Sequence, residues 1–267
     1  MITSENLKSI RGVCFDIDDT FSSHGKITAQ AFNALWELKK AGFFLVPVTG
    51  RPAGWCDHLA RFWPVDGVVG ENGAFTFYMH QGVRKRIDTL SPTESEQAKS
   101  KLSNLRKAIQ DHFPDAQFAS DQNYREYDLA IDFCEDVPAW APQQIDDLVS
   151  FCESQGAIAK ISSIHVNTWF GRYTKRDGIK AFVEFALKHI DPHFPAFGTR
   201  GDEWIYVGDS PNDEPLFEAF EYSVGVANVT PFLPKMKFHP RWITQASCGE
   251  GFSELAAALI GAKKLSG

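Results

Sequence analysis

Three aspartates lie close together near the start of the chain, at Asp16, Asp18 and Asp19, directly after the apolar segment 12–15. In an extended segment, residues two apart share a side, so Asp16 and Asp18 can face one site. Two carboxylates this close repel each other unless one is protonated or a cation lies between them. Asp16 could therefore bind Mg²⁺, and a protonated Asp18 could donate to the oxygen of a leaving group.

A second acidic cluster follows the apolar segment 204–207, in the run Gly-Asp-Ser-Pro-Asn-Asp that begins at Gly208. Asp209 and Asp213 add hard oxygen ligands of the kind that Mg²⁺ prefers. If both clusters share one pocket, Coulomb repulsion makes the arrangement costly without a divalent cation. The alternative for either cluster alone is structural, because aspartates at strand ends often cap helices or form turns.

Two further positions suit the binding of an anionic phosphoryl group. Thr49 and Gly50 end an apolar segment before an expected helix, so a hydroxyl and backbone N–H groups could hold phosphate oxygens. Lys175 precedes another expected helix and offers a positive charge. Taken singly, Thr49 could be only a helix cap and Lys175 only a solvated side chain. The joint occurrence of these features at strand-to-helix junctions favours a common site.

Strands and helices alternate in the part of the chain that must position these residues. Residues 12–16, 43–48 and 67–69 are short and apolar, as expected of buried strands. Apolar spacing of three and four predicts a helix over 28–41, and Pro52 marks the start of the next one. This order predicts an α/β fold with a doubly wound, mostly parallel Rossmann-like sheet, which binds ligands at its carboxyl edge.

The pattern changes in the middle of the chain and later returns. Antiparallel strands are expected over 74–79, 83–87, 116–118, 128–133, 157–161 and 165–170, with helices over 92–112 and 141–155. The earlier order resumes with helices over 179–189, 211–220 and 250–260 and strands over 204–207, 222–226 and 242–244. We therefore expect a catalytic core domain of residues 1–81 and 171–267, with an α+β cap domain of residues 82–170 inserted into it.

Composition narrows the class of protein. The 267 residues suffice for such a core and a smaller domain, and the net charge of −7, with scattered Lys and Arg, argues against a nucleic-acid partner. No apolar run approaches the ~20 residues of a membrane helix, and residues 1–10 are too polar for a signal peptide. The five cysteines include no CxxC pair, which argues against structural zinc or disulfides and favours a reducing cytoplasm.

The motifs of this chain resemble the four motifs of the haloacid dehalogenase superfamily of phosphotransferases. The matching residues, in motif order, are Asp16, Asp18 and Thr20 of a D-x-D-x-T pattern, Thr49 of a Thr-Gly-Arg run, Lys175, and Asp209 and Asp213 of the last acidic cluster. The Asn-Gly pair after Glu71 looks like that of the Cof-like branch. That branch carries its cap between the second and third motifs, where the change of pattern lies in this chain.

The resemblance implies a Mg²⁺-dependent phosphatase that forms an aspartyl-phosphate. Asp16 would attack phosphorus, and Asp18 would protonate the leaving alcohol and later deprotonate water. An aspartate at position 18 favours phosphate transfer over dehalogenation, which has no alcohol to protonate. Mg²⁺ would be bound by Asp16, the backbone carbonyl of Asp18, and Asp209, with Asp213 acting directly or through water.

The same resemblance implies that residues of the second and third motifs bind the substrate within the core. Thr49 and Lys175 would hold the phosphoryl oxygens, and Gly50, Arg51 and Asn72 are further candidates for substrate binding.

The third motif departs from the usual Lys-Gly. Here Arg176 follows Lys175, which makes Lys180 a fallback for the motif lysine.

The last strand of the expected cap holds the candidates for reading the substrate. Alternation along the strand places His165, Asn167 and Trp169 on one face, which could offer hydrogen bonds and a stacking surface to a sugar. The alternative is that Trp169 packs in the cap core and His165 lies at the surface. Tyr124 and Arg125, in a polar loop, could also reach the opening. The substrate expected is a small phosphate ester, such as a sugar or polyol phosphate.

Two other functions remain open from the sequence. A phosphomannomutase-like phosphotransferase shares these motifs and this cap, and would return the phosphoryl group to a sugar instead of water. A non-enzymatic phospho-acceptor domain would also carry an aspartate at a strand end, although such domains are shorter and have no inserted cap. The oligomeric state stays open.

Overall fold

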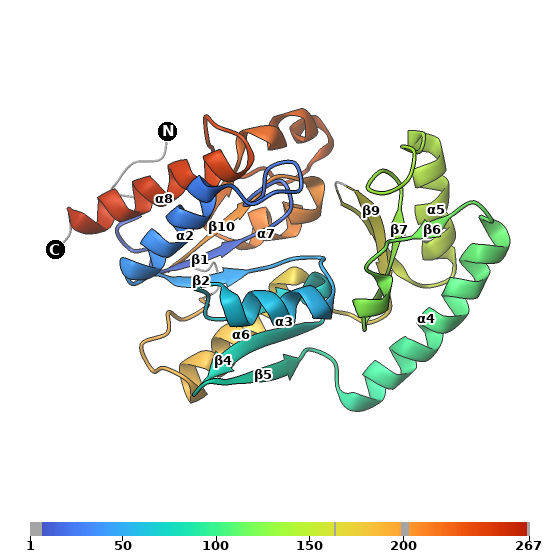
Figure 1. Cartoon of the computed structure of the whole chain (residues 1–267), viewed down its shortest axis with the longest axis horizontal. Coiled ribbons are helices and arrows are strands. Elements are labelled where there is room, and N and C mark those ends of the chain that lie inside the picture. The colour runs from blue at the N-terminus through green and yellow to red at the C-terminus, as the bar shows by residue number, and fades with distance from the viewer. Residues whose placement is uncertain (1–6, 163, 199–202, 266–267) are drawn as a thin grey trace.

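The computed structural model describes residues 7–162, 164–198 and 203–265. A five-stranded parallel sheet lies among the helices of the larger part of the molecule (Figure 1). Its strands follow the order β12-β11-β10-β1-β2. Its strands are β1 (Gly12–Phe15), β2 (Phe44–Pro47), β10 (Trp204–Gly208), β11 (Tyr222–Gly225) and β12 (Trp242–Ile243). Because β1 and β10 are neighbours and run in parallel, the acidic clusters that follow them meet at one edge of the sheet.

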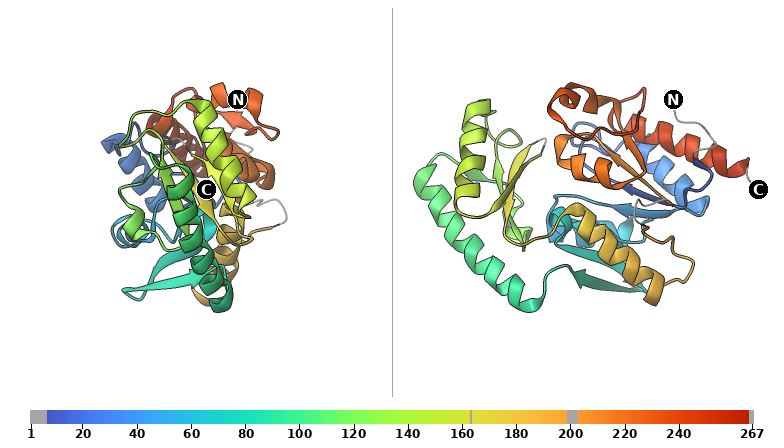
Figure 2. Two further views of the ribbon diagram at one scale, coloured as in Figure 1. Left: turned by 90° about the vertical axis from the view of Figure 1, so that its right-hand side faces the viewer. Right: turned by 180° about the vertical axis from the view of Figure 1, so that it is seen from behind.

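Helices cover both faces of this sheet, as a doubly wound fold requires. The helices on one face are α2 (Ala29–Lys40) and α8 (Cys248–Lys264), and those on the other are α6 (Lys175–His189) and α7 (Glu214–Ala219) (Figure 2). Val13 and Phe15 share a buried cluster with α2 and α8, whereas Cys14 packs with residues of α6 and α7. Successive strand residues point to opposite faces, so β1 is buried on both sides. The predicted α/β class is confirmed.

A second, three-stranded sheet extends the core. It consists of β3 (Val68–Gly70), β4 (Phe75–His80) and β5 (Val83–Asp88), all antiparallel, with α3 (Ala53–Phe62) packed beside it. The sequence predicts β3 as a third parallel strand, yet its ladder partner is β4. A single parallel bridge between Val48 and Val69 still joins β2 to β3. Strand β3 therefore forms an antiparallel ladder with β4 and one parallel bridge with the end of β2. The ladder forms because the chain turns back into β4 directly after the loop of residues 71–73.

The remaining sheet belongs to the inserted segment. Four antiparallel strands lie in the order β6-β7-β9-β8, and two helices pack on them (Figure 1). The elements are β6 (Gln117–Phe118), β7 (Asp128–Asp132), β8 (Ile158–Ile161), β9 (His165–Trp169), α4 (Pro92–His112) and α5 (Pro142–Ser154). Their apolar faces share one buried cluster, which includes Leu102, Ile131, Leu148 and Val166. This α+β arrangement agrees with the expected inserted cap.

Two boundaries differ from the prediction in ways that concern the site. Helix α6 begins at Lys175 with Thr174 as its N-cap, four residues earlier than the apolar pattern indicates. The apolar pattern does not reveal this start, because the residues of the first turn are mostly polar and contribute to the site instead of the hydrophobic core. The expected helix 211–220 begins as a 3₁₀ turn, η3 (Pro211–Asp213), before α7. In the part of the chain that the structure describes, no helix is both long and apolar enough to cross a membrane.

The division into a core of residues 1–81 and 171–267 and a cap of residues 82–170 stays a prediction. Strand β5 lies inside the second range but pairs with β4 of the first. We call the sheet β6–β9, together with α4, α5 and the loops between them, the cap.

Candidate active site

Asp16, Lys175 and Asp213 form a buried network at the carboxyl edge of the parallel sheet. Lys175 Nζ donates to Asp16 Oδ1 at 2.7 Å and to Asp213 Oδ1 at 2.9 Å. Burial lowers the pKa of Lys175, but the two carboxylates outweigh burial and raise the pKa above its ordinary value. The ammonium thus stays charged and holds Asp16 in one orientation. We call these three residues the inner network.

The loop η1 (Glu71–Gly73) fixes the start of α6, and with it Lys175. Glu71, Asn72 and Gly73 all have positive φ, of 43°, 57° and 107°. A Cβ at Gly73 would lie 2.0 Å from the carbonyl oxygen of Thr174, so no side chain fits between this loop and the N-cap of α6. This contact explains the Asn-Gly pair that the sequence shows at this place.

Both oxygens of Asp213 accept hydrogen bonds from the protein. Oδ1 accepts from Tyr206 Oη at 2.5 Å in addition to Lys175. Oδ2 accepts from the backbone N–H groups of Asp209 at 3.0 Å and Ser210 at 3.3 Å. Asp213 is fully buried and is therefore placed to hold Lys175 and the turn after β10, with no oxygen left for a short bond to a cation.

Asp209 is oriented by two neutral donors. Thr20 Oγ1 donates to Asp209 Oδ1 at 2.9 Å, and Asn228 Nδ2 donates to Oδ2 at 3.3 Å. Asn228 Nδ2 also donates to the carbonyl oxygen of Asp19 at 3.0 Å, which ties the loop after β11 to the loop after β1. These contacts give Thr20, the last residue of the first motif, a definite role in positioning an acid of the fourth.

The acids facing the site are costly to ionise together. Burial raises the pKa of Asp16 to about 7; Lys175 opposes this shift, and Asp213 and Asp18 add to it. Burial also raises the pKa of Asp209 well above its usual value, and Asp213 and Asp16 raise it further. A divalent cation between Asp16 and Asp209 would relieve this repulsion.

The donor set fits Mg²⁺ with few protein ligands. Asp16, Asp18 and Asp209 line one cavity of about 30 Å³. Among residues 7–162, 164–198 and 203–265, no three His, Cys, Asp or Glu side chains are grouped so as to hold a metal ion by themselves. Mg²⁺ usually keeps several waters and binds through one or two carboxylates, which two aspartates and a backbone carbonyl can provide.

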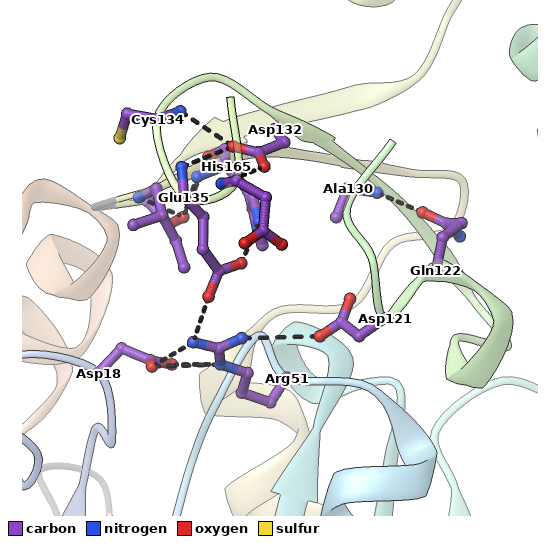
Figure 3. A network of polar contacts seen from close by, with 12 residues as sticks. Asp18, Arg51, Asp121, Gln122, Ala130, Asp132, Cys134, Glu135 and His165 are labelled. Atoms are coloured by element: carbon purple, nitrogen blue, oxygen red, sulfur yellow. Dashed lines mark hydrogen bonds and ion pairs between the residues drawn. The ribbon is translucent and has the colours of Figure 1, made fainter. Parts of the chain in front are cut away.

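A second network, the outer network, joins the core to the cap (Figure 3). Arg51 Nε donates to both oxygens of Asp18 at 3.1 Å, and Nη2 donates to Oδ1 at 2.9 Å. Arg51 Nη2 also donates to Glu135 Oε1 of the cap at 3.2 Å, and Nη1 lies 3.6 Å from Asp121 Oδ2. Glu135 Oε2 lies 2.9 Å from His165 Nε2. One guanidinium therefore links the second acid of the first motif to the cap.

The cap is also held to the core by a buried carboxylate. Glu71 accepts from the backbone N–H of Ala53 in the core at 3.0 Å and from that of Tyr127 in the cap at 2.5 Å. Next to it, Arg125 Nη1 donates to the carbonyl oxygen of Gly50 at 2.8 Å. Arg125, which the sequence places in a polar loop near the opening, thus reaches the site by holding the second motif.

The predicted site residues divide into a group at the cavity and a group behind its wall. The first group lines the cavity: Asp16, Asp18, Gly50, Arg51, His165, Asn167 and Asp209. The second group is buried and does not line it: Thr49, Asn72, Lys175 and Asp213. Thr49 Oγ1 accepts from the N–H of Arg51 at 3.0 Å, which is a structural role in the loop that follows β2. Lys180 is exposed and lies 3.9 Å from Glu184, whereas Lys175 contacts Asp16.

The structure places the three residues expected on one face of the last cap strand, His165, Asn167 and Trp169, in different surroundings. His165 and Asn167 are 3% and 4% exposed and line the cavity, so His165 does not lie at the surface. Asn167 Nδ2 donates to Asp128 Oδ2 at 3.1 Å, which fixes its amide. Trp169 packs against Tyr173 with ring centroids 5.9 Å apart, inside the buried cluster of the cap, as the alternative interpretation has it.

Three functional contacts are not visible from the sequence. Glu135 lies in the loop after β7 with no motif around it, and only the fold brings it to Arg51. Tyr206 lies within an apolar strand segment, and nothing in the sequence distinguishes it from the other residues of that strand. Asn228 follows β11 at the same sheet edge as the acidic clusters, and this strand-end position is a signal that could have been used.

Comparison with known proteins supports the same family. Residues 13–127 match the family model of haloacid dehalogenase-like hydrolases. A protein named phosphoglycolate phosphatase from Methanothermobacter thermautotrophicus is 24% identical over 257 residues, covering 94% of this chain and 100% of the relative.

Solved structures share the fold. A crystal structure of a Thermoplasma acidophilum protein has a TM-score of 0.69 at 18% identity and covers 94% of this chain and 98% of its own. The sucrose-phosphatase of Synechocystis, in complex with sucrose and phosphate, has a TM-score of 0.61 at 18% identity, with 93% of this chain and 97% of that chain covered. The matched motifs, the geometry of the acids and this fold lead to one conclusion: residues 13–127 match the haloacid dehalogenase-like hydrolases, and the whole chain is similar in fold to proteins of that kind.

Proposed function

We propose that this chain is a Mg²⁺-dependent phosphatase that hydrolyses a small phosphate monoester through a phosphoryl-aspartate on Asp16. The observation that carries the proposal is the orientation of Asp16. Its Oδ1 is held by Lys175, and Asp16 lines the same small cavity as Asp18. A carboxylate fixed in this way can attack phosphorus without a further entropic cost of being ordered.

The reaction consists of two displacements at phosphorus. Asp16 attacks, the bond from phosphorus to the leaving oxygen breaks, and Asp18 gives its proton to that oxygen. Asp18, now a carboxylate, then takes a proton from the water that attacks the phosphoryl-aspartate, and inorganic phosphate leaves. In the present structure Arg51 binds both oxygens of Asp18, which suits the carboxylate form. The first step therefore requires this contact to loosen.

Asp16, Asp209 and the backbone carbonyl of Asp18 would hold Mg²⁺, which would supply positive charge next to the phosphoryl oxygens. Lys175 adds a fixed charge on the other side of Asp16. Thr49 holds the N–H of Arg51 and so shapes the second motif, while Gly50 and Arg51 line the cavity beside Asp18. Asp213 positions Lys175.

The substrate we propose is small. The cavity shared by the core acids and the cap residues His165 and Asn167 has a volume of about 30 Å³, which suits a phosphoryl group. The relatives named phosphoglycolate phosphatase and the sucrose-phosphatase with bound sucrose and phosphate support a leaving group with carboxylate or hydroxyl groups.

The test is release of inorganic phosphate from a panel of phosphate esters, with and without Mg²⁺, by the wild type and Asp16→Asn. We expect Mg²⁺-dependent release that Asp16→Asn abolishes. Equal release by both proteins would overturn the proposal. Release without a bisphosphate activator separates a phosphatase from a phosphomutase, which would return the phosphoryl group to the sugar.

A further inference from the structure

A second cavity, of about 410 Å³, lies beside the catalytic one between the cap and the core. Residues of β8 and β9 form one wall, and the first turns of α6, η3 and α7 form the other. Asn212 lines both cavities. Asn72, which lines the second, lies against Gly50, which lines the first. The two spaces are therefore neighbours across these two asparagines.

Buried polar groups without partners line this second cavity. Asn72, Trp169 and Tyr173 are 3%, 3% and 0% exposed. Within the described chain, no hydrogen-bond partner is found for the amide atoms of Asn72, for Trp169 Nε1 or for Tyr173 Oη. A buried polar group left unpaired costs on the order of 1–3 kcal/mol, so the wall of this cavity holds three residues with polar atoms that a ligand could satisfy if these side chains turned toward it.

The mouth of the cavity is positively charged. Lys160 and Arg176 line it and are exposed, and neither forms an ion pair with any residue that the structure describes. The nearest acid of the wall, Glu214, accepts from the backbone N–H groups of Lys237 and Phe238. Lys175 also lines the cavity, but its ammonium is bound by the inner network.

We propose that this second cavity binds the leaving group of the substrate, and that this leaving group carries a second anionic group. The inference rests on the proposed phosphatase function. The phosphoryl group lies at Asp16, and the rest of the ester passes Asn72 and Asn212. Its hydroxyl groups meet Trp169 Nε1 and Tyr173 Oη, and its anionic end meets Lys160 and Arg176. A volume of about 410 Å³ exceeds what glycolate needs, so the preferred leaving group is larger than glycolate.

The experiment compares 6-phosphogluconate with glucose 6-phosphate, two six-carbon esters of which only the first has a carboxylate. Phosphoglycolate serves as a short anionic ester. We expect the highest kcat/KM for 6-phosphogluconate. Lys160→Gln combined with Arg176→Gln should lower that value about tenfold through KM, with a change of less than twofold for glucose 6-phosphate.

Trp169→Phe removes the N–H group and keeps a ring. It should lower kcat/KM for both six-carbon esters about fivefold and leave phosphoglycolate within twofold. Lys180→Gln, an exposed lysine on the same helix as Arg176, is the matched control and should change nothing. Equal effects of these variants on all three esters, or no effect on any, would overturn the inference while leaving Asp16-dependent hydrolysis intact.

A binding measurement keeps the inference separate from the proposed function. Asp16→Asn, which cannot form the phosphoryl-aspartate, is titrated with 6-phosphogluconate by calorimetry, alone and with Lys160→Gln and Arg176→Gln. We expect binding that the two added substitutions weaken about tenfold. Unchanged affinity would contradict the second cavity as the binding site, even if none of the esters were hydrolysed.

Discussion

The two charged networks of the site differ in what they connect. The inner network of Asp16, Lys175 and Asp213 lies wholly within the core and is almost fully buried. The outer network joins Asp18 through Arg51 to Glu135 and His165 of the cap, and its acids Asp18 and Glu135 keep 28% and 30% of their side chains exposed. Both networks place a positively charged side chain, Lys175 or Arg51, beside an aspartate of the first motif. Only the outer one crosses from core to cap.

This difference separates the roles of the two aspartates. In the proposed reaction, the nucleophile Asp16 has to stay fixed through both displacements, and burial with a shared ammonium provides this. In the same proposal, Asp18 has to give up and regain a proton, and a partly exposed ion pair with the cap would allow it to change partners. Opening of the cap would break the contact between Arg51 and Glu135 without disturbing Lys175. Substitutions in the inner network should therefore be more damaging than substitutions in the outer one.

Lys175→Met should cause the largest loss. It leaves Asp16 and Asp213 buried with no cation between them, and breaking a buried pair in this way costs about 3–5 kcal/mol. We expect the free energy of unfolding in urea without Mg²⁺ to fall by that amount, and kcat to fall by about 10³-fold. Lys180→Met, on an exposed turn of the same helix, is the control. A kcat within tenfold of the wild type would show that the inner network is not needed.

Asp18→Asn should lower kcat by about 10²- to 10⁴-fold for alkyl phosphates, the range for loss of a general acid and base. Para-nitrophenyl phosphate needs little protonation of its leaving oxygen, so its first step should be much less affected. The burst of nitrophenol in rapid mixing measures that step. If the variant slowed the burst as strongly as it slows alkyl phosphates, Asp18 would not be the acid.

Arg51→Met should act on cap closure more than on the inner network. It removes the contacts to Asp18 and Glu135 together, so the cap should open more often. We expect faster hydrogen exchange in β9 and a fall in kcat/KM of about tenfold, as for the loss of one charged hydrogen-bonding group. Arg61→Met, on the exposed end of α3, is the matched control. Unchanged exchange in β9 would argue that Arg51 does not hold the cap.

Glu135→Gln should give the smallest effect, and a pH-dependent one. A hydrogen bond with His165 and the charge of Arg51 lower the pKa of Glu135 to about 2, against the effect of burial. An acid whose pKa is lower in the folded protein stabilises the fold fully at pH values above its pKa in the unfolded chain, which is near 4.5. This stabilisation is lost as the pH falls toward the folded-state pKa of about 2. Because Glu135 is partly exposed, we expect a loss of about 1 kcal/mol at pH 7.

The control for this pH effect is Asp136→Asn, at the adjacent exposed acid. Urea unfolding at pH 5 and pH 3 should show the difference between Glu135→Gln and the wild type shrinking at the lower pH, because this interval lies across the range between the unfolded and the folded pKa. A difference that grew as the pH fell would contradict the assigned ion pair.

The sequence predicts the core better than the connections between core and cap. Asp16, Asp18 and Asp209 follow β1 and β10, and adjacent parallel strands bring such residues to one edge without further information. The start of α6 is missed because its first turn is polar and serves the site. The contacts of Glu135 and Glu71 depend on how an inserted sheet packs on the core, and short-range spacing does not encode this.

The proposed reaction depends above all on a phosphoryl-aspartate on Asp16. It can be trapped by mixing the protein with ³²P-labelled ester and Mg²⁺, stopping the reaction in acid within milliseconds, and mapping the label by peptide mass spectrometry. We predict label on Asp16 that appears before inorganic phosphate, disappears in a chase with unlabelled ester, and is absent from Asp16→Asn. Steady release of phosphate with no label on Asp16 at any time, or full turnover by Asp16→Asn, would contradict this mechanism.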